Sequence, residues 1–317
     1  MKNGPDTEQL LKWIEARDIR GLARAISIVE NDEPAVVDLL NYAFANVKKS
    51  LTVGFTGTPG SGKSTLIDSL VKDYRNEKRR VGIIAVDPSS PFSGGSILGD
   101  RIRMNRHSLD PGVFIRSLAN RGSLGGLSEA TKRVLYLYKA FGFDVIIVET
   151  VGVGQDEIDI VKYADVTAVV LAPDQGDNIQ MSKAGIMEVA DLFIVNKSDK
   201  IEAETTKRAL ESSLNLLPEI RRPPVISTIA IKNQGIDETL RMIDKVSHCS
   251  ESNSLEKYRS RIKEEIRSSI VHSIVQDIEP FVEEMSEKVL KGSLTPMDVV
   301  STYRALFTRQ IKEIKSH

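Results

Sequence analysis

Cysteine and histidine are scarce in this 317-residue sequence. Cys249 is the only cysteine, and the four histidines are scattered along the chain. One cysteine excludes an internal disulfide, and the His-rich tracts or paired cysteines typical of nickel, cobalt or zinc delivery are missing. The composition therefore argues against a metallochaperone. It favours a reducing compartment, with the cytoplasm as the first expectation and an organelle matrix as the alternative.

Long hydrophobic runs and an excess of one charge are also missing. The chain carries 43 Lys and Arg against 44 Asp and Glu, for a net charge of −1. No overall attraction to nucleic acid or to an anionic membrane follows, and we expect neither as a partner. The longest apolar runs, such as residues 166–172, have the length of a strand and are too short to span a bilayer. The first residues show no signal-peptide pattern.

Seven short apolar runs, rich in Val and Ile, follow one another from residue 51 onward. Helical patterns separate most of them, which predicts an α/β fold with a doubly wound, mostly parallel sheet. The expected strands are 51–55, 81–86, 113–117, 145–148, 166–171, 192–195 and 224–227. The expected crossover helices are 64–76, 129–141, 179–190, 205–217 and 236–246.

Helical patterns also flank this region on both sides. We predict an N-terminal helical segment over residues 1–48, the α/β domain over 49–249 and a C-terminal helical extension over 250–317. Asn31 or Asp32 is expected to cap the third helix. In the extension, isoleucines recur every fourth residue from Ile262 to Ile278, and Pro280 is expected to kink the helix. This stripe must pack on the α/β domain or on a second subunit, and we favour a dimerisation arm.

A phosphate-binding loop follows the first expected strand. The residues fit the pattern G-x-x-x-x-G-K-S, in which glycines let backbone N–H groups face phosphate oxygens at the start of a helix. Lys63 is expected to reach the β- and γ-phosphates, and the Ser64 hydroxyl is a hard oxygen ligand for Mg²⁺. The expected nucleotide-binding residues here are Gly57, Pro59, Gly60, Ser61, Gly62, Lys63, Ser64 and Thr65. The chain is predicted to be a P-loop NTPase.

A second motif selects the base. Asn196, Lys197 and Asp199 follow the strand at 192–195 and form the pattern N-K-x-D. The Asp199 carboxylate can accept hydrogen bonds from guanine N1–H and the exocyclic amine, whereas adenine lacks this donor pair. Asn196 can hold neighbouring loops, and the Lys197 stem can cover the ring. The sequence therefore predicts GTP rather than ATP.

Acidic residues stand near the ends of two other strands. Asp87 and Glu149 would lie at the carboxyl edge of the sheet, where Mg²⁺ commonly takes one or two carboxylates. Gly152 is placed to donate its backbone N–H to the γ-phosphate. Many small GTPases carry a water-orienting glutamine after that glycine, but here Val153 occupies the position. We therefore expect slow intrinsic hydrolysis that a partner or dimerisation accelerates.

Longer runs of sequence point to a family. Residues 86–91 (VDPSSP), 93–104 (SGGSILGDRIRM) and 149–155 (ETVGVGQ) resemble the MeaB/ArgK/MMAA family, and the similarity extends along nearly the whole chain. The resemblance implies a homodimeric GTPase that binds GTP, GDP and Mg²⁺. It further implies a chaperone of a cobalamin-dependent acyl-CoA mutase, usually methylmalonyl-CoA mutase. Such a chaperone gates adenosylcobalamin loading and protects or reactivates the mutase.

The resemblance also assigns residues. Ser64, Asp87, Asp100 and Glu149 match the family's magnesium-associated positions. The catalytic set then comprises Lys63, Asp100, Glu149 and Gly152. A loop that couples nucleotide state to the mutase matches a segment carrying Asp177, Gln180 and Lys183, which the residues alone would have assigned to a solvated loop.

One departure and three alternatives remain. The last guanine loop of such proteins commonly reads Ser-Ala, and Ile229-Ala230 stands there in this chain. Because the Ala230 backbone N–H can still face guanine O6, we expect GTP selectivity to persist with weaker affinity. The alternatives are a kinase or ATPase linked to basic amino-acid transport, a metallochaperone GTPase, and a nucleotide-dependent scaffold without relevant hydrolysis. The sequence does not name the mutase.

Overall fold

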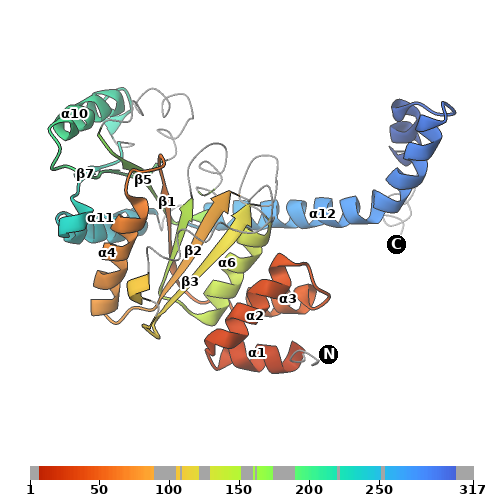
Figure 1. Cartoon of the computed structure of the whole chain (residues 1–317), viewed down its shortest axis with the longest axis horizontal. Coiled ribbons are helices and arrows are strands. Elements are labelled where there is room, and N and C mark those ends of the chain that lie inside the picture. The colour runs from red at the N-terminus through yellow and green to blue at the C-terminus, as the bar shows by residue number, and fades with distance from the viewer. Residues whose placement is uncertain are drawn as a thin grey trace. The chain divides into compact units, whose positions relative to one another are not determined.

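The computed structural model describes residues 7–88, 105–107, 109–120, 129–150, 160, 163–173, 190–219, 222–250 and 254–304 (Figure 1). The chain divides into two compact units, residues 1–257 and residues 258–317. The N-terminal helices therefore share one unit with the sheet. Each unit is described by itself.

The first unit contains a seven-stranded sheet in the order β3-β2-β4-β1-β5-β6-β7. Every described pairing is parallel, as expected for strands buried on both faces. The seven predicted strands are confirmed, four of them with small extensions. Their bounds are β1 Leu51–Thr56, β2 Val81–Pro88, β3 Val113–Asn120, β4 Val145–Thr150, β5 Val166–Leu171, β6 Leu192–Val195 and β7 Val225–Ser227.

Alternate residues of each strand enter different hydrophobic clusters. Ile83 and Ile147 pack with helices α4 (Lys63–Asn76) and α11 (Ile236–Ser250). Their neighbours Ile84 and Ile146 pack with α6 (Glu129–Phe141). Successive side chains of a strand point to opposite faces, so a continuous apolar run fills both layers. The helix α10 (Glu202–Leu214) covers the far part of the α6 face, against β5 and β6.

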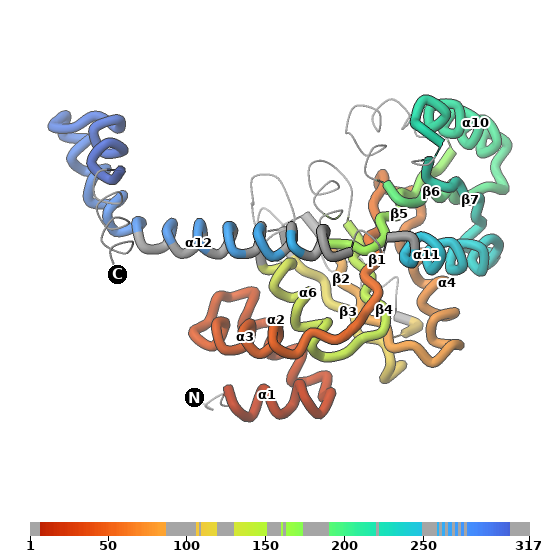
Figure 2. The backbone as a smooth tube through the Cα atoms, turned by 180° about the vertical axis from the view of Figure 1, so that it is seen from behind, coloured from red at the N-terminus to blue at the C-terminus, as the bar shows by residue number. Residues whose placement is uncertain are grey.

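The N-terminal helices add a further layer beside α6 (Figure 2). Their bounds are α1 Thr7–Glu15, α2 Ile19–Glu30 and α3 Val36–Ala45. The partly buried Arg116 of β3 forms an ion pair with Glu30 of α2, which fixes this layer to the sheet. The predicted cap of α3 is wrong. Asn31 ends α2 instead, Asp32 accepts a hydrogen bond from Arg133, and α3 begins after Ala35 without a side-chain cap.

Two helices, α10 (Glu202–Leu214) and α11 (Ile236–Ser250), differ from the sequence prediction by three or more residues at an end. The helix α10 begins and ends three residues earlier than the expected 205–217. Glu202 and Glu204 lie in its first turn, where acidic side chains stabilise the positive end of a helix. The helix α11 continues to Ser250, beyond the expected end at residue 246. The expected helix at 179–190 falls outside the described residues, except for residue 190.

The second unit contains most of α12 (Ser254–Leu290), which remains helical through Pro280. Residues 296–304 are helical as well. The rings of Phe281 and Tyr303 lie 6.0 Å apart, and Met285 is buried, so the end of α12 packs against the following helix. Farther back along α12, Ile266 and Ile270 are about half exposed. Among the described residues, every helix is too short or too polar to cross a membrane.

Candidate nucleotide-binding site

The phosphate-binding loop connects β1 to α4, at the point where the strand order reverses. β4 and β5 flank β1 on its two sides, which is the usual position of a ligand crevice in such sheets. Gly62 precedes α4 with a φ of 89°, a left-handed conformation that favours glycine. A Cβ there would also collide with the Asn196 side-chain amide. The glycine thus permits both the turn and the close approach of a second loop.

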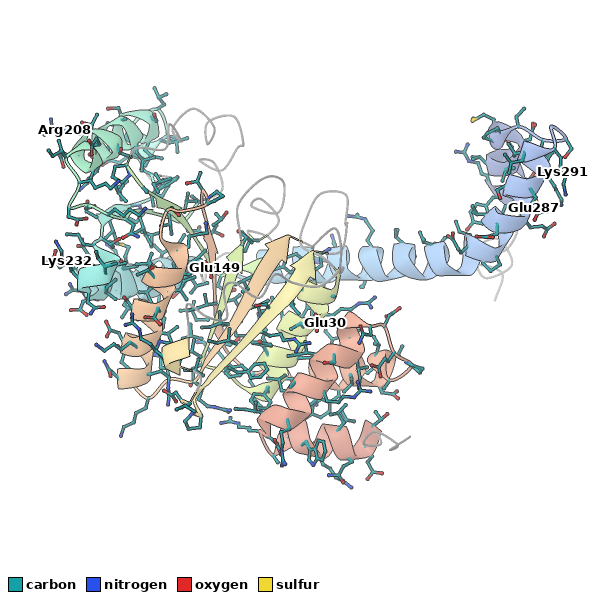
Figure 3. All side chains as sticks on the ribbon, viewed as in Figure 1. Glu30, Glu149, Arg208, Lys232, Glu287 and Lys291 are labelled. Carbon is teal, nitrogen blue, oxygen red and sulfur yellow. The ribbon has the colours of Figure 1, made fainter. Side chains whose placement is uncertain are left out.

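Lys63 and Ser64 begin α4, and the Lys63 side chain points back into the loop. The buried Lys63 ammonium donates hydrogen bonds to the backbone oxygens of Gly57, at 2.5 Å, and Thr58, at 3.0 Å. The loop therefore curls around this positive charge. The Ser64 hydroxyl donates to Glu149 Oε1 at 2.8 Å, and the Glu149 side chain is buried beside α4 (Figure 3). The predicted serine and carboxylate thus meet, although they are far apart in sequence.

Asn196 joins three loops. Its side-chain nitrogen donates to the Ser61 backbone oxygen at 3.0 Å. Its side-chain oxygen accepts from the Thr228 hydroxyl at 3.1 Å and from the Ala230 backbone N–H at 3.2 Å. Asn196 is 2% exposed, so its amide is shielded from water and these hydrogen bonds satisfy it instead. The phosphate loop and the predicted base loops therefore form one connected site.

Lys197 and Asp199 lie at the outer edge of this site. The backbone of Lys197 adopts a φ of 58°, which is uncommon for a residue with a side chain and typical of functional loops. Its ammonium donates to the Gly60 backbone oxygen at 2.7 Å, so the lysine stem bridges the base loop and the phosphate loop. Asp199 is partly exposed and lies 3.6 Å from the Lys232 ammonium. The Lys232 ammonium therefore lies beside the carboxylate that would bind a guanine base.

Several predicted site residues cannot be placed in the geometry. Asp87 belongs to β2, near its carboxyl end, but its side chain lies outside the described residues. The rest of the predicted magnesium, catalytic and partner-coupling set also falls outside the described residues: Asp100, Gly152, Asp177, Gln180 and Lys183. Val153 of the hydrolysis prediction lies there too.

Sequence reasoning missed two residues that support the site. Ser69 of α4 donates to the Ala230 backbone oxygen at 3.2 Å, which ties the phosphate-loop helix to the short helix η3 (Ala230–Lys232). Thr228 orients the Asn196 amide from the other side. Both are small hydroxyl residues that resemble many others in the sequence. The sequence offered one indication of this role, which is that Thr228 directly precedes the base loop at Ile229-Ala230.

Comparison with known proteins decides the family. A family model described as methylmalonyl Co-A mutase-associated GTPase MeaB matches residues 22–282. The chain belongs to the MeaB family of GTPases. A Pyrococcus abyssi protein is 45% identical over 304 residues, which cover 91% of this chain and 93% of that protein. The mouse methylmalonic aciduria type A homolog, a mitochondrial protein, is 34% identical and covers 87% of this chain and 73% of its own length.

A solved structure supports the fold. The crystal structure of an LAO/AO transport system kinase matches with a TM-score of 0.70, over 97% of this chain and 99% of that one. At 24% sequence identity, this match supports the P-loop NTPase fold and no more specific conclusion. MeaB-family membership implies guanine-nucleotide binding.

The described residues fit the magnesium ion that GTPases use. Ser64 and Glu149 supply two hard oxygen donors in contact with each other, at the start of the helix that follows the phosphate loop. Mg²⁺ prefers one or two carboxylates together with phosphate oxygens and water. Among the described residues, no group of three or more His, Cys, Asp or Glu side chains is arranged to hold a metal by protein ligands alone.

Proposed function

We propose that this MeaB-family GTPase is a slow Mg²⁺-dependent switch that controls a cobalamin-dependent acyl-CoA mutase, with methylmalonyl-CoA mutase as the first choice. In this proposal a homodimer in the cytoplasm gates adenosylcobalamin loading and protects or reactivates the mutase. The family description supports the mutase association. The observation that carries the GTPase itself is the Asn196 junction, because it joins the phosphate loop to both base loops.

The described residues divide the work on the nucleotide. Lys63 would exchange the Gly57 and Thr58 carbonyl oxygens for β- and γ-phosphate oxygens and so neutralise negative charge there. Ser64 and Glu149 would hold Mg²⁺, directly or through water, and the metal would supply charge stabilisation to the phosphates. The N-terminus of α4 adds its positive dipole end to the same phosphates.

Base selection belongs to the loops around Asn196. Asp199 would accept two hydrogen bonds from guanine and exchange its contact with Lys232 for them. The Ala230 N–H, which donates to Asn196 in this structure, would in our proposal donate to guanine O6. Because Ala230 is anchored by Ser69 and Asn196, Ile229 at the preceding position is compatible with GTP selectivity. We expect a lower affinity rather than a changed preference.

Exchange of the base-reading carboxylate tests the nucleotide. Asp199→Asn should weaken GTP binding by about a hundredfold, since one acceptor is replaced by a donor that faces the guanine amine. XTP carries an oxygen in place of that amine, so its affinity should rise in the same variant. Asp237→Asn, at an exposed acid of α11, is the matched control. Tighter binding of ATP than GTP by the wild type would reject the GTPase and favour the transport-linked ATPase.

Recovery of the mutase tests the chaperone role. The full chain is immobilised and incubated with a cobalamin-dependent mutase, with GDP or with a non-hydrolysable GTP analogue, and the bound cobalamin is quantified. We expect the mutase to be retained and its cobalamin content to differ between the two nucleotide states. The turnover of GTP should increase when the mutase is added, since Val153 replaces the usual glutamine. Absence of mutase in both states would remove the chaperone role and leave the GTPase intact.

A further inference from the structure

Three basic side chains gather at the amino edge of the sheet, opposite the nucleotide site. Lys48 precedes β1 and Arg80 precedes β2, so both enter the sheet where its parallel strands begin. Arg17 follows α1 in the N-terminal layer. Arg17 and Lys48 meet at Gly142, between α6 and β4, and Arg80 lies close enough to repel Lys48. The proposed function assigns no role to this cluster.

The backbone of Gly142 marks the centre of the cluster. The position that a Cβ on Gly142 would occupy lies 3.1 Å from Arg17 Nη2 and 3.3 Å from Lys48 Nζ. The two charged nitrogens therefore lie close to the same point. Arg80 covers the flanking residues, with its guanidinium 5.1 Å from the Phe141 ring centre and 5.5 Å from that of Phe143. Arg80 therefore flanks the position where Arg17 and Lys48 meet.

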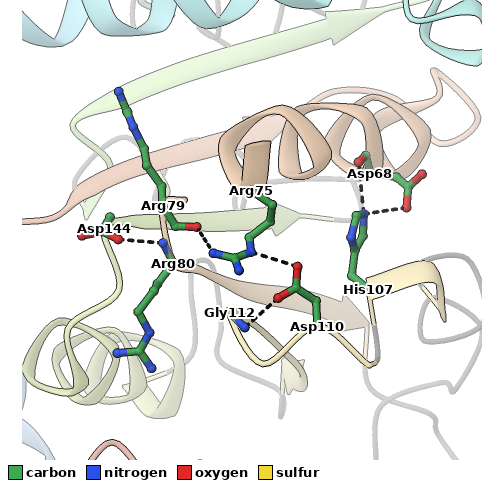
Figure 4. A network of polar contacts seen from close by, with 8 residues as sticks. All are labelled: Asp68, Arg75, Arg79, Arg80, His107, Asp110, Gly112 and Asp144. Atoms are coloured by element: carbon green, nitrogen blue, oxygen red, sulfur yellow. Dashed lines mark hydrogen bonds and ion pairs between the residues drawn. The ribbon is translucent and has the colours of Figure 1, made fainter. Parts of the chain in front are cut away.

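The nearby carboxylates of Glu15 and Asp144 do not neutralise the positive charge of these three side chains. Asp144 accepts a hydrogen bond from the backbone N–H of Arg80 at 2.6 Å, and Figure 4 shows the Arg80 guanidinium directed away from that carboxylate. Arg80 Nη1 is buried and has no hydrogen-bond partner among the described residues. Partial removal from water lowers the pKa of both Lys48 and Arg80, and the next cause in each case is repulsion by Arg17. The attractions of Glu15 for Lys48 and Asp144 for Arg80 are smaller.

A structural role for these cations is the simpler alternative. Basic side chains near the end of α6 would stabilise the negative end of its dipole. One cation would serve that purpose, whereas three that repel one another destabilise the folded state. An arginine beside a lysine also matches phosphate, because the guanidinium offers paired donors and the ammonium adds a point charge. A dianion at Gly142 would convert the repulsion into attraction.

We propose that Arg17, Lys48 and Arg80 form a second anion site, separate from the P-loop, that binds the phosphate group of a small molecule. The buried Arg80 Nη1 and the two nitrogens around Gly142 supply the donors. The site lies between the N-terminal layer and the sheet. A bound phosphate would therefore stabilise the packing of α1 within the first unit.

The test measures binding of inorganic phosphate to the full chain with the P-loop saturated by GDP. The melting temperature is followed against phosphate concentration, and sodium chloride at equal ionic strength corrects for screening. The variant Arg17→Gln/Lys48→Gln changes two exposed residues, and Lys72→Gln/Lys245→Gln removes the same charge elsewhere. We expect a saturable rise in the wild type and the control. The Arg17→Gln/Lys48→Gln affinity should fall by about tenfold or more, since each cation contributes a charge-assisted hydrogen bond.

Three further comparisons decide between the alternatives. In phosphate-free buffer, Arg17→Gln/Lys48→Gln should melt at the same temperature as the wild type or higher, because repulsion is removed. A lower melting temperature with an unchanged phosphate response would overturn the site and assign the cations to α6. The phosphate response should persist in Lys63→Ala, and its loss there would place the binding in the P-loop. Equal responses to citrate and phosphate, or to chloride and phosphate, would also overturn the proposal.

Discussion

Isoleucine serves different purposes in the two units of this molecule. In the first unit, Ile83, Ile84, Ile146 and Ile147 stand in adjacent pairs within strands, and all four are fully buried. In the second unit, Ile266 and Ile270 stand four residues apart on α12 and are 55% and 53% exposed. In the strands, adjacent isoleucines point to opposite faces of the sheet and fill the hydrophobic clusters on both. On α12 it forms a stripe along one side of a helix.

The two units therefore differ in whether their repeated isoleucines are buried within the same unit. The strands of the first unit bury their apolar side chains within that unit, and this core holds polar side chains such as Asn196 and Glu149 in fixed positions. The second unit leaves apolar side chains at the surface, and burial of each would contribute about 1.5–3 kcal/mol. Exposed apolar stripes of this kind mark contact surfaces. We propose that a second copy of the chain covers it, in line with the predicted dimerisation arm.

The largest effect is expected from the buried cation of the first unit. Lys63→Ala should lower the rate of GTP hydrolysis by about a hundredfold or more, because a preorganised positive charge beside the phosphates is lost. The overall fold should persist, since these partners of Lys63, the Gly57 and Thr58 backbone oxygens, belong to the loop itself. Turnover by Lys72→Ala, an exposed position on the same helix, provides the control. A similar rate in both variants would contradict the assigned role of Lys63.

The second effect concerns the connections inside that unit. Asn196→Ala removes three hydrogen bonds at a buried position and leaves the Ala230 N–H and the Thr228 hydroxyl without this acceptor. The free energy of unfolding should fall by about 2–4 kcal/mol, and GDP binding should weaken with it. Urea unfolding and GDP titration measure the two quantities. If Asn41→Ala, at an exposed asparagine, costs as much, then the Asn196 junction is not what holds the loops together.

Much of the first unit could be predicted because its local and global patterns agree. The seven apolar runs that became β1–β7 are rich in Val and Ile and are bounded by helical or turn segments. The P-loop and the N-K-x-D motif, typical of nucleotide sites, fixed where Lys63 and Asn196 would lie, and parallel strands bring such loops to one edge. The bounds of α10 could not be read so well, because its apolar positions continue past its end to Leu217.

The remaining site residues depend on contacts between distant parts of the chain. Ser69 and Ala230 are joined by a hydrogen bond across 161 positions, and nothing in either local sequence marks the pair. Arg17, Lys48 and Arg80 are ordinary basic residues until the fold gathers them at one turn. Asn31 and Asp32 have side chains suited to a helix cap. In the structure, however, Asn31 ends α2 and Asp32 accepts a hydrogen bond from Arg133.

The third effect tests the exposed stripe of the second unit. Ile266→Glu/Ile270→Glu places two like charges on the proposed contact surface and should raise the dimer dissociation constant by about tenfold or more. Sedimentation or light scattering over a concentration series measures it. Lys263→Glu, at an exposed residue of the same helix, reverses a charge outside the stripe and serves as the control. A monomeric wild type, or an unchanged dimer in the double variant, would show that the stripe has another partner.

The smallest effect is expected where a polar contact of the first unit lies near the surface. Asp110 accepts a hydrogen bond from Arg75 at 2.9 Å and another from the Gly112 backbone at 2.8 Å (Figure 4). The Arg75 hydrogen bond is the main reason that the pKa of Asp110 is lowered. A lowered pKa stabilises the fold at pH values above the unfolded-state pKa of about 3.9 and loses that effect as pH falls through the folded-state value.

Asp110→Asn should therefore reduce the free energy of unfolding by up to about 1 kcal/mol near pH 7, since a partly exposed ion pair contributes little. The difference from the wild type should shrink as the pH falls below about 4, where the carboxyl of the wild type becomes neutral too. Urea unfolding at a series of pH values measures the difference, and Asp237→Asn gives the background. A loss as large as that of Asn196→Ala would remove the contrast between buried and exposed polar contacts in this unit.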